Sequence, residues 1–146
     1  MKLKQLSLFL ENKPGTLSAP CRILAEAGIN LLTLTVADTL QFGILRIVVR
    51  DWEKAKKILE DHGCVVKVSD VVAIEVDDRP GGMMRILDVL EKYRINVEYM
   101  YAFTSKQEDK GVLVFRFDDA DGAIRAMQSN NISVVDSVAL FKRMDA

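Results

Sequence analysis

The sequence predicts an α+β protein made of two copies of one βαββαβ unit, each an antiparallel sheet with helices on one face. The main observation is a self-match at a fixed period. Residues 11–17 (ENKPGTL) return as residues 77–83 (DDRPGGM), and residues 29–31 (INL) return as residues 95–97 (INV). A second observation is that strand-like alternation and helix-like spacing follow one another in the same order in both copies.

The repeat also predicts the domain organisation. Beyond a loop the register shifts by two residues, and residues 43–45 (GIL) match residues 111–113 (GVL). A chain of 146 residues would by length alone suggest one domain. The duplication favours two domains, residues 1–69 and 70–146.

Each copy opens with a strand, because apolar residues alternate with polar ones. The inward positions are apolar in both copies: Leu6, Leu8 and Leu10 in the first, and Val72, Ile74 and Val76 in the second. A Pro-Gly pair ends each strand.

A helix follows in each copy. Pro20 falls near the first turn, where the missing N–H costs little. Gly28 stands where a helix end favours a left-handed residue. Tyr93 and Arg94 replace Ala27 and Gly28 in the second copy, so that helix must end without a glycine.

The remaining elements complete the unit. Asp51 and Asp119 are expected to cap a second helix in each copy, and Gly63 and Asn131 are expected to close it. Three further strands are expected per copy, at residues 31–37, 42–50 and 64–68, and at residues 97–103, 111–117 and 132–135. The resulting order is the ferredoxin-like arrangement.

The face of each sheet that the helices leave open carries apolar residues, namely Phe9, Ile44, Val48, Val112 and Val114. We expect these faces, or the sheet edges, to be buried against each other or against a second chain. The alternative is scattered surface apolar residues, which are common in globular proteins.

The composition excludes several classes of function. Twenty Lys and Arg balance 21 Asp and Glu without a basic cluster, so no nucleic-acid partner is expected. No apolar run approaches the length that spans a bilayer, and no signal peptide precedes the first strand. Two unpaired cysteines, Cys21 and Cys64, fit a reducing compartment, and the expected location is the cytoplasm.

The Pro-Gly junction is the best candidate for a binding site. Glycine lets backbone approach a ligand, and the helix that follows presents free N–H groups to an anion. Asn12 and Asn30 are expected to approach this loop from neighbouring strands and to recognise an amino acid. The alternative is that both side chains satisfy turn backbone.

These motifs resemble those of ACT domains, small regulatory modules that bind amino acids, and the resemblance covers nearly the whole chain. It implies that a ligand is bound at an interface between two ACT units, and it implies two sets of ligand-binding residues. These are Asn12, Pro14, Gly15, Thr16, Leu17, Asn30 and Leu31 in the first copy, and Asp78, Pro80, Gly81, Gly82, Met83, Asn96 and Val97 in the second.

The departures from the family pattern affect the expected ligand. Asp78 replaces the counterpart of Asn12, so the two copies differ in charge. Leu10 and Val76 stand where some serine-binding members carry a histidine, which disfavours serine. The apolar surroundings favour a branched-chain or aromatic amino acid. We therefore expect a stand-alone, non-catalytic sensor without a cofactor, forming a homodimer and acting on an unidentified regulated enzyme.

Two other functions remain open. An enzyme of acylphosphatase type would need an arginine in the loop after the first strand, which only Arg79 supplies, and no nucleophile–base pair accompanies it. His62 is expected to contact helix carbonyls, and the isolated His and Cys residues cannot form a structural metal site alone. Asp118, Asp119 and Asp121 are explained by helix capping. The stronger alternative is a protein-interaction adaptor with no small-molecule ligand.

Overall fold

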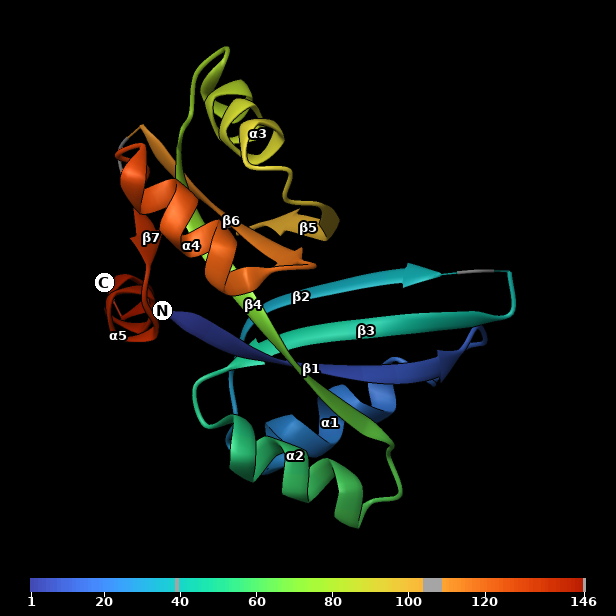
Figure 1. Cartoon of the computed structure of the whole chain (residues 1–146). Helices are drawn as coiled ribbons and strands as arrows, with labels where there is room; N and C mark the ends of the chain where they lie inside the picture. The colour runs from blue at the N-terminus through green and yellow to red at the C-terminus, as the bar shows by residue number, and fades with distance from the viewer. Residues whose placement is uncertain (39, 104–108, 146) are drawn as a thin grey trace. The chain divides into compact units, whose positions relative to one another are not determined.

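The computed structural model describes residues 1–38, 40–103 and 109–145, which form two compact units (Figure 1). The first unit comprises Lys4–Ser69, and the second comprises Asp70–Ala146 together with Met1–Leu3. The boundary falls inside one long strand, β4 (Val66–Asp77).

The first unit follows the predicted βαββαβ order. It contains, in chain order, β1 (Lys2–Glu11), α1 (Ser18–Glu26), β2 (Leu31–Asp38), β3 (Phe42–Val49), α2 (Trp52–Asp61) and the start of β4. Its strands lie in the order β2-β3-β1-β4, and β1 and β2 both run antiparallel to β3.

The second unit repeats the order and adds one helix. The end of β4 is followed by α3 (Gly82–Lys92), β5 (Val97–Ala102), β6 (Lys110–Phe117), α4 (Ala120–Ser129), β7 (Val134–Val135) and α5 (Ser137–Met144). Both β5 and β4 pair antiparallel with β6, and β7 pairs with the other side of β4. The α+β fold class of two ferredoxin-like units is confirmed.

The same hydrogen bonds end four helices. At the end of α1, Gly28 N–H donates to Ala25 O and Ile29 N–H donates to Leu24 O, at 3.0 and 2.9 Å. The equivalent pairs of bonds close α2, α3 and α4. The left-handed residue is Gly28, Gly63, Arg94 or Asn131, with φ between 54° and 84°. This is the Schellman motif, in which both bonds satisfy carbonyls that the helix leaves unpaired.

The predicted caps are also confirmed. Asp51 accepts a hydrogen bond from Lys54 N–H at 3.1 Å, and Asp119 accepts one from Gly122 N–H at 2.8 Å. Asp136 caps α5 in the same way. These carboxylates satisfy N–H groups that have no intrahelical partner.

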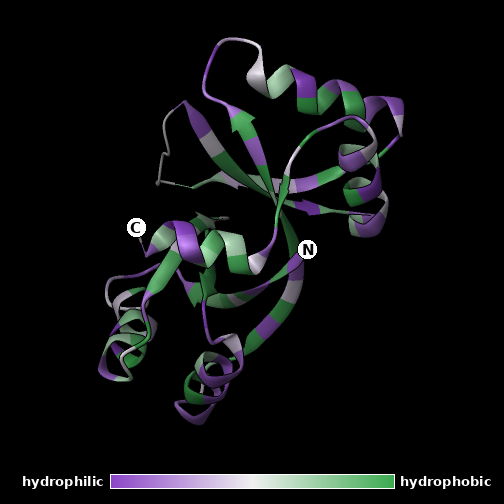
Figure 2. Ribbon diagram, turned by 90° about the vertical axis from the view of Figure 1, so that its left-hand side faces the viewer, coloured by the Kyte–Doolittle hydropathy of each residue, from purple (hydrophilic) through white to green (hydrophobic). Residues whose placement is uncertain are grey.

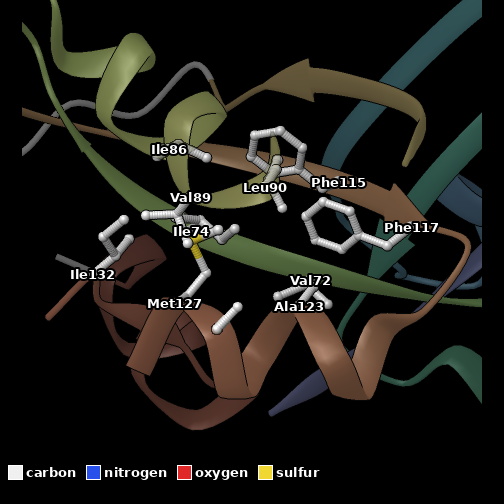
Figure 3. Packing of buried hydrophobic residues seen from close by; sticks show 11 residues of the cluster. Val72, Ile74, Ile86, Val89, Leu90, Phe115, Phe117, Ala123, Met127 and Ile132 are labelled. Atoms are coloured by element: carbon white, nitrogen blue, oxygen red, sulfur yellow. The ribbon is translucent and has the colours of Figure 1, made fainter. Parts of the chain in front are cut away.

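The helices bury one stripe of apolar residues each, and hydrophobic and hydrophilic residues alternate along the strands (Figure 2). In the second unit α3 and α4 pack on β4 and β6 around Phe115 and Phe117, whose rings stack with centroids 5.2 Å apart (Figure 3). The first unit has an equivalent core built around Leu6, Leu8 and Leu24.

Three features differ from the sequence-based expectation. The strands expected at residues 64–68 and 72–76 are parts of a single strand, β4. Helix α5 was not predicted, and its Leu140 is buried. On the faces away from the helices, Val48, Val112 and Val114 are buried, whereas Phe9 is 70% exposed.

Candidate functional site

The two Pro-Gly loops have the same backbone geometry. Gly15 and Gly81 both have left-handed φ values, 90° and 86°, and each accepts a hydrogen bond from the backbone N–H four residues later. The residue after the strand donates its N–H across the sheet end in both units, from Asn12 to Gln41 O and from Asp78 to Asp109 O. The repeat therefore extends to the hydrogen bonds of the candidate site.

In the first loop the side chains of the expected site hold the turn together. Thr16 Oγ1 donates to Glu11 O at 2.6 Å, and the same hydroxyl lies 2.9 Å from Lys13 O. Asn12 Nδ2 donates to Leu40 O at 3.4 Å. The Asn12 side chain therefore contacts turn backbone in this structure, and its role in ligand binding stays a prediction.

The second loop replaces Thr16 with Gly82. A Cβ atom at Gly82 would collide with the carbonyl oxygen of Asp77, so the start of α3 lies directly against the end of β4. Only glycine permits this approach. The second loop is consequently tighter than the first at the position where the helix begins.

Helices α1 and α3 begin without a side-chain cap. Their N-cap residues are Leu17 and Gly81, and neither makes a side-chain hydrogen bond to the helix. The other three helices of the described chain are each capped by an aspartate. The first N–H groups of an uncapped helix favour an anion such as a carboxylate.

The expectation that Asn12 and Asn30 approach the same loop is wrong within one unit. Strand β3 lies between β1 and β2. The end of β1 pairs with Phe42, the first residue of β3, whereas Leu31 pairs with Val49, the last residue. Because each strand residue advances about 3.3 Å, the two ends lie about 25 Å apart. Asn30 and Leu31 are therefore separated from the rest of the first set.

The second unit shows the same separation. Asp77 pairs with Lys110, the first residue of β6, at the end of the sheet that carries the Pro-Gly loop. Asn96 lies at the opposite end, where its N–H donates to the Asp118 carboxylate at 3.0 Å. Asn96 and Val97 thus do not join Asp78, Pro80, Gly81, Gly82 and Met83 within this unit.

A pocket of about 590 Å³ lies beside the second loop. Its lining is mainly apolar, and one side is formed by the charged start of the loop. The lining residues are Val76, Asp77, Asp78, Arg79, Pro80, Met83, Met100, Ala102, Phe103, Gly111, Val112 and Leu113. A pocket of this size and character is typical of small-molecule sites.

Three of these lining residues were expected from the sequence, and the others were not. Asp78, Pro80 and Met83 were expected at the site. Met100 and Ala102 were missed because the residues expected from this part of the chain, Asn96 and Val97, lie at the start of β5, whereas the pocket lies at its end. The repeat gave no signal for them, since Leu34 and Val36, at the same positions of β2, were not expected at the first site either.

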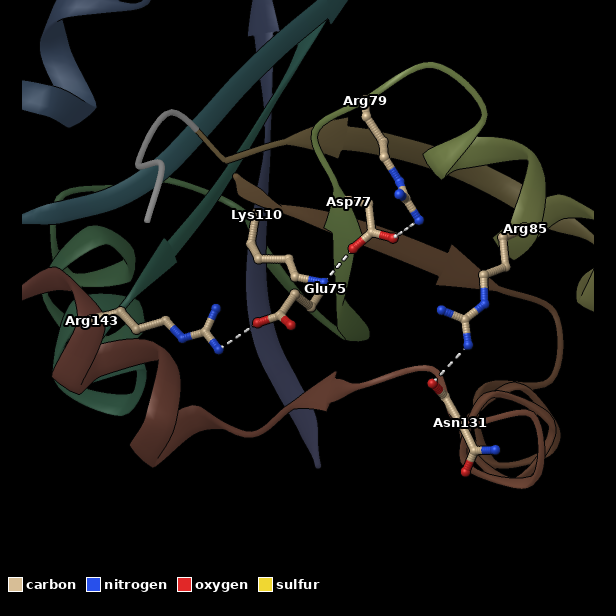
Figure 4. A network of polar contacts seen from close by, with 7 residues as sticks. All are labelled: Glu75, Asp77, Arg79, Arg85, Lys110, Asn131 and Arg143. Carbon is tan, nitrogen blue, oxygen red and sulfur yellow. Dashed lines mark hydrogen bonds and ion pairs between the residues drawn. The ribbon is translucent and has the colours of Figure 1, made fainter. Parts of the chain in front are cut away.

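Ionic contacts fix the charged side of the pocket (Figure 4). The Asp77 carboxylate pairs with the Lys110 ammonium and with Arg79, whose Nη2 lies 3.2 Å away. The hydrogen bond from Lys110 lowers the pKa of Asp77, and the charges of Lys110, Arg79 and Arg85 add to this effect. The pKa of Lys110 is raised for the same reason. Asp77 therefore remains an anion at neutral pH and holds the loop to β6.

Other candidate groups have structural roles. His62 Nδ1 lies 2.8 Å from Ile58 O at the end of α2, as expected. Asp118 accepts the backbone N–H groups of Asn96 and Asp119. Cys21 is half-buried, and burial raises the pKa of the Cys64 thiol. Within residues 1–38, 40–103 and 109–145 no group of three His, Cys, Asp or Glu could hold a metal ion.

The duplicated units, each with an uncapped helix after its Pro-Gly loop, define a pair of small ferredoxin-like modules. The chain matches the family model "ACT domain pair" over residues 1–144, and it belongs to this family. The resemblance seen in the sequence is thereby confirmed. None of the helices in the described part of the chain is long and apolar enough to cross a membrane.

Individual relatives agree with this family. The crystal structure of protein BT0572 from Bacteroides thetaiotaomicron is 36% identical, covers 97% of both chains and has a TM-score of 0.90. The ligand-free regulatory subunit of aspartate kinase from Thermus thermophilus shares the fold, with 15% identity, coverage of 87% of this chain and 91% of that chain, and a TM-score of 0.62.

One curated relative carries a functional name. The acetolactate synthase small subunit of Buchnera aphidicola subsp. Baizongia pistaciae is 30% identical over 101 residues, which is 64% of this chain. The match spans 63% of the length of that relative.

Proposed function

We propose that this protein is a non-catalytic regulatory subunit that senses an apolar amino acid at its Pro-Gly loops. The observation that supports this best is the pocket of about 590 Å³ beside the second loop. It combines apolar walls with a charged rim and an uncapped helix N-terminus. An amino acid with an apolar side chain has the matching chemistry, because its ammonium and carboxylate need polar partners and its side chain needs a dry surface.

The charged rim provides partners of both signs. Asp78 supplies a carboxylate for an ammonium group, and Arg79 supplies a guanidinium for a carboxylate. The first N–H groups of α3 add a further partner for the carboxylate. Branched-chain and aromatic amino acids are therefore the favoured ligands.

The asparagines at the start of β2 and β5 would enter such a site only from another ACT unit. Asn30 and Asn96 lie at the sheet ends opposite to the loops of their own units. We propose that a second chain provides this contact in a homodimer. The exposed ring of Phe9, on the sheet face away from the helices, is consistent with a further surface that a partner covers.

The regulated target is proposed to be a separate enzyme. The Buchnera relative is named as the small subunit of an enzyme, and the aspartate kinase structure is that of a regulatory subunit. An adaptor that binds a partner protein without any small molecule is the competing function.

A thermal-melt screen against the twenty amino acids at millimolar concentration tests the proposal. A ligand at about 100 times its dissociation constant adds roughly 2.7 kcal/mol, which should raise the melting temperature by roughly 5–10 °C. Arg79→Ala should reduce the shift, whereas Arg125→Ala, on the exposed face of α4, should leave it unchanged. If no amino acid raises the melting temperature, the adaptor is favoured.

The homodimer is tested separately by light scattering. A monomer at micromolar concentration would contradict it.

A further inference from the structure

The pocket of the second unit has a structural counterpart in the first unit. On the helix side of the second sheet, Leu113 pairs with Ala102 and Gly111 pairs with Val76. The same pairs in the first unit are Leu45 with Val36 and Gly43 with Leu10. Directly opposed residues of antiparallel strands share a face, so both units build the same surface beside their Pro-Gly loop.

The side chains that line this surface differ between the units. In the first unit Leu17, Leu34 and Val36 are 41%, 50% and 45% exposed. Their counterparts in the second unit are Met83, Met100 and Ala102, all of which line the pocket. The change from Val36 to Ala102 removes two methyl groups from the end of the edge strand. The side chain at this point is therefore smaller in the second unit, where the pocket lies, than in the first.

We propose that the second-unit pocket is selective for an amino acid with a large apolar side chain, an aromatic one above all, and that Ala102 and Met100 set this selectivity. This inference rests on the proposed function and narrows its ligand class. The ligand's side chain would lie between Met83 on α3 and Met100 and Ala102 on β5. Methionine side chains are flexible and polarizable, and they pack favourably against aromatic rings.

The size of the pocket supports a large side chain. A volume of about 590 Å³ would be filled poorly by serine, alanine or valine, and its walls would lose the contacts that a larger group provides. Phe103 and Leu113 add further apolar surface to the same pocket. The described lining residues all belong to the second unit, so this unit would supply the wall that contacts the ligand's side chain.

The polar end of the pocket also distinguishes the units. The second loop places Asp78 beside Arg79, whereas the first places neutral Asn12 beside Lys13. Arg79 and Lys13 are both paired with the carboxylate that ends the preceding strand, Asp77 at 3.2 Å and Glu11 at 2.6 Å. The residue before the basic side chain is therefore a carboxylate, Asp78, in the second unit and a neutral amide, Asn12, in the first. This difference favours zwitterionic ligands over neutral amides or free acids at the second loop.

A matched pair of variants tests the inference by isothermal titration calorimetry. Ala102→Leu fills the proposed pocket, and Val36→Leu places the same side chain at the equivalent position of the first unit. Ala102 is exposed at the end of β5, so the added side chain should not disturb the core. Ala102→Leu should weaken the binding of L-phenylalanine at the second-unit site at least about tenfold, the effect of a clash worth about 1.4 kcal/mol, and Val36→Leu should change binding at that site less than twofold.

A second pair of variants tests the wall of the pocket by shortening a side chain rather than enlarging one. Met100→Ala should weaken L-phenylalanine binding several-fold, while Leu34→Ala should have little effect. Circular dichroism of all four variants establishes that they are folded. L-valine and L-serine, titrated into the unmodified protein, should bind more weakly than L-phenylalanine.

The outcomes separate the inference from the proposed function. If L-valine binds and L-phenylalanine does not, or if Val36→Leu rather than Ala102→Leu weakens binding, this inference is wrong and the sensor function stands. If no amino acid binds the unmodified protein, the sensor function is wrong as well. Weakening by Ala102→Leu together with tighter binding of L-phenylalanine than of L-valine would establish the assignment.

Discussion

Arg94 ends α3 in the backbone conformation that Gly28 adopts at the end of α1. Their φ values are 55° and 69°, and both residues donate the same Schellman hydrogen bond. A residue with a side chain pays a steric cost in this region that glycine does not. Arg94→Gly should therefore raise the free energy of unfolding by up to about 1 kcal/mol.

The matched control for this prediction is Gly28→Ala. Nothing crowds a Cβ atom at Gly28, so only the backbone conformation opposes the alanine. This variant should lower the free energy of unfolding by about 1 kcal/mol. Urea denaturation measures both changes, and a loss of stability in Arg94→Gly would contradict the argument.

The pairing of Asp77 with Lys110 and Arg79 predicts a loss of stability in acid. The pKa of Asp77 is lower in the folded protein than its ordinary value of 3.8 because the bonded Lys110 favours the anion. The folded state thus binds this proton less readily than the unfolded state does. The stabilisation is complete above the ordinary pKa and is lost as the pH falls through the lower, folded value.

Urea midpoints measured from pH 7 to pH 2.5 test this dependence. Asp77→Asn should be less stable than the unmodified protein at pH 7 and should show a shallower fall in acid. Asp88→Asn, an exposed carboxylate on α3, should keep the original slope. Parallel curves for Asp77→Asn and the unmodified protein would show that Asp77 is not responsible.

Gly82 should tolerate no side chain. A Cβ atom there collides with the backbone oxygen of Asp77, which cannot move without displacing β4 or α3. Gly82→Ala should cost about 2–3 kcal/mol, although alanine ordinarily favours a helix. Thr16→Ala, at the equivalent position of the first unit, should cost only about 1 kcal/mol through loss of the hydroxyl's hydrogen bonding to Glu11 O. Thermal unfolding of both variants gives the comparison.

Helix α5 should be held mainly by Leu140. This side chain is 1% exposed, and Arg143 adds an ion pair with Glu75 at 2.7 Å. Leu140→Ala should cost about 2–4 kcal/mol, because a buried leucine leaves a cavity. Val138→Ala, on the same helix but 75% exposed, should cost less than about 0.5 kcal/mol. Equal effects of the two changes would show that α5 is not docked through Leu140.

Most of the fold could be predicted from the sequence because two copies carry the same local signals. The Asp51 and Asp119 caps, the left-handed Gly28 and the role of His62 follow from short-range chemistry, and each is confirmed. Helix α5 was missed because the first copy has no counterpart from which to infer it. Its own signals, an aspartate cap before an apolar stretch, are short.

The candidate site was harder to predict because it depends on strand order. Asn12 and Asn30 were expected on neighbouring strands. Strand β3 lies between β1 and β2, and the two asparagines lie at opposite ends of the first unit's strands. Sequence spacing specifies which residues share a face of one strand, and it does not specify which strands are neighbours. Met100 and Ala102 could be assigned to the pocket only after the pairing of β5 with β6 was known.

Strand β4 has a consequence for attempts to divide the protein. The last strand of one repeat and the first strand of the next are continuous from Val66 to Asp77, so the boundary between the copies falls within a strand. A gene cut at Ser69 would leave each half with a severed strand and newly exposed backbone hydrogen-bonding groups. Fragments that share the whole of β4, each carrying its own copy of the strand, are the better choice for studying one ligand site at a time.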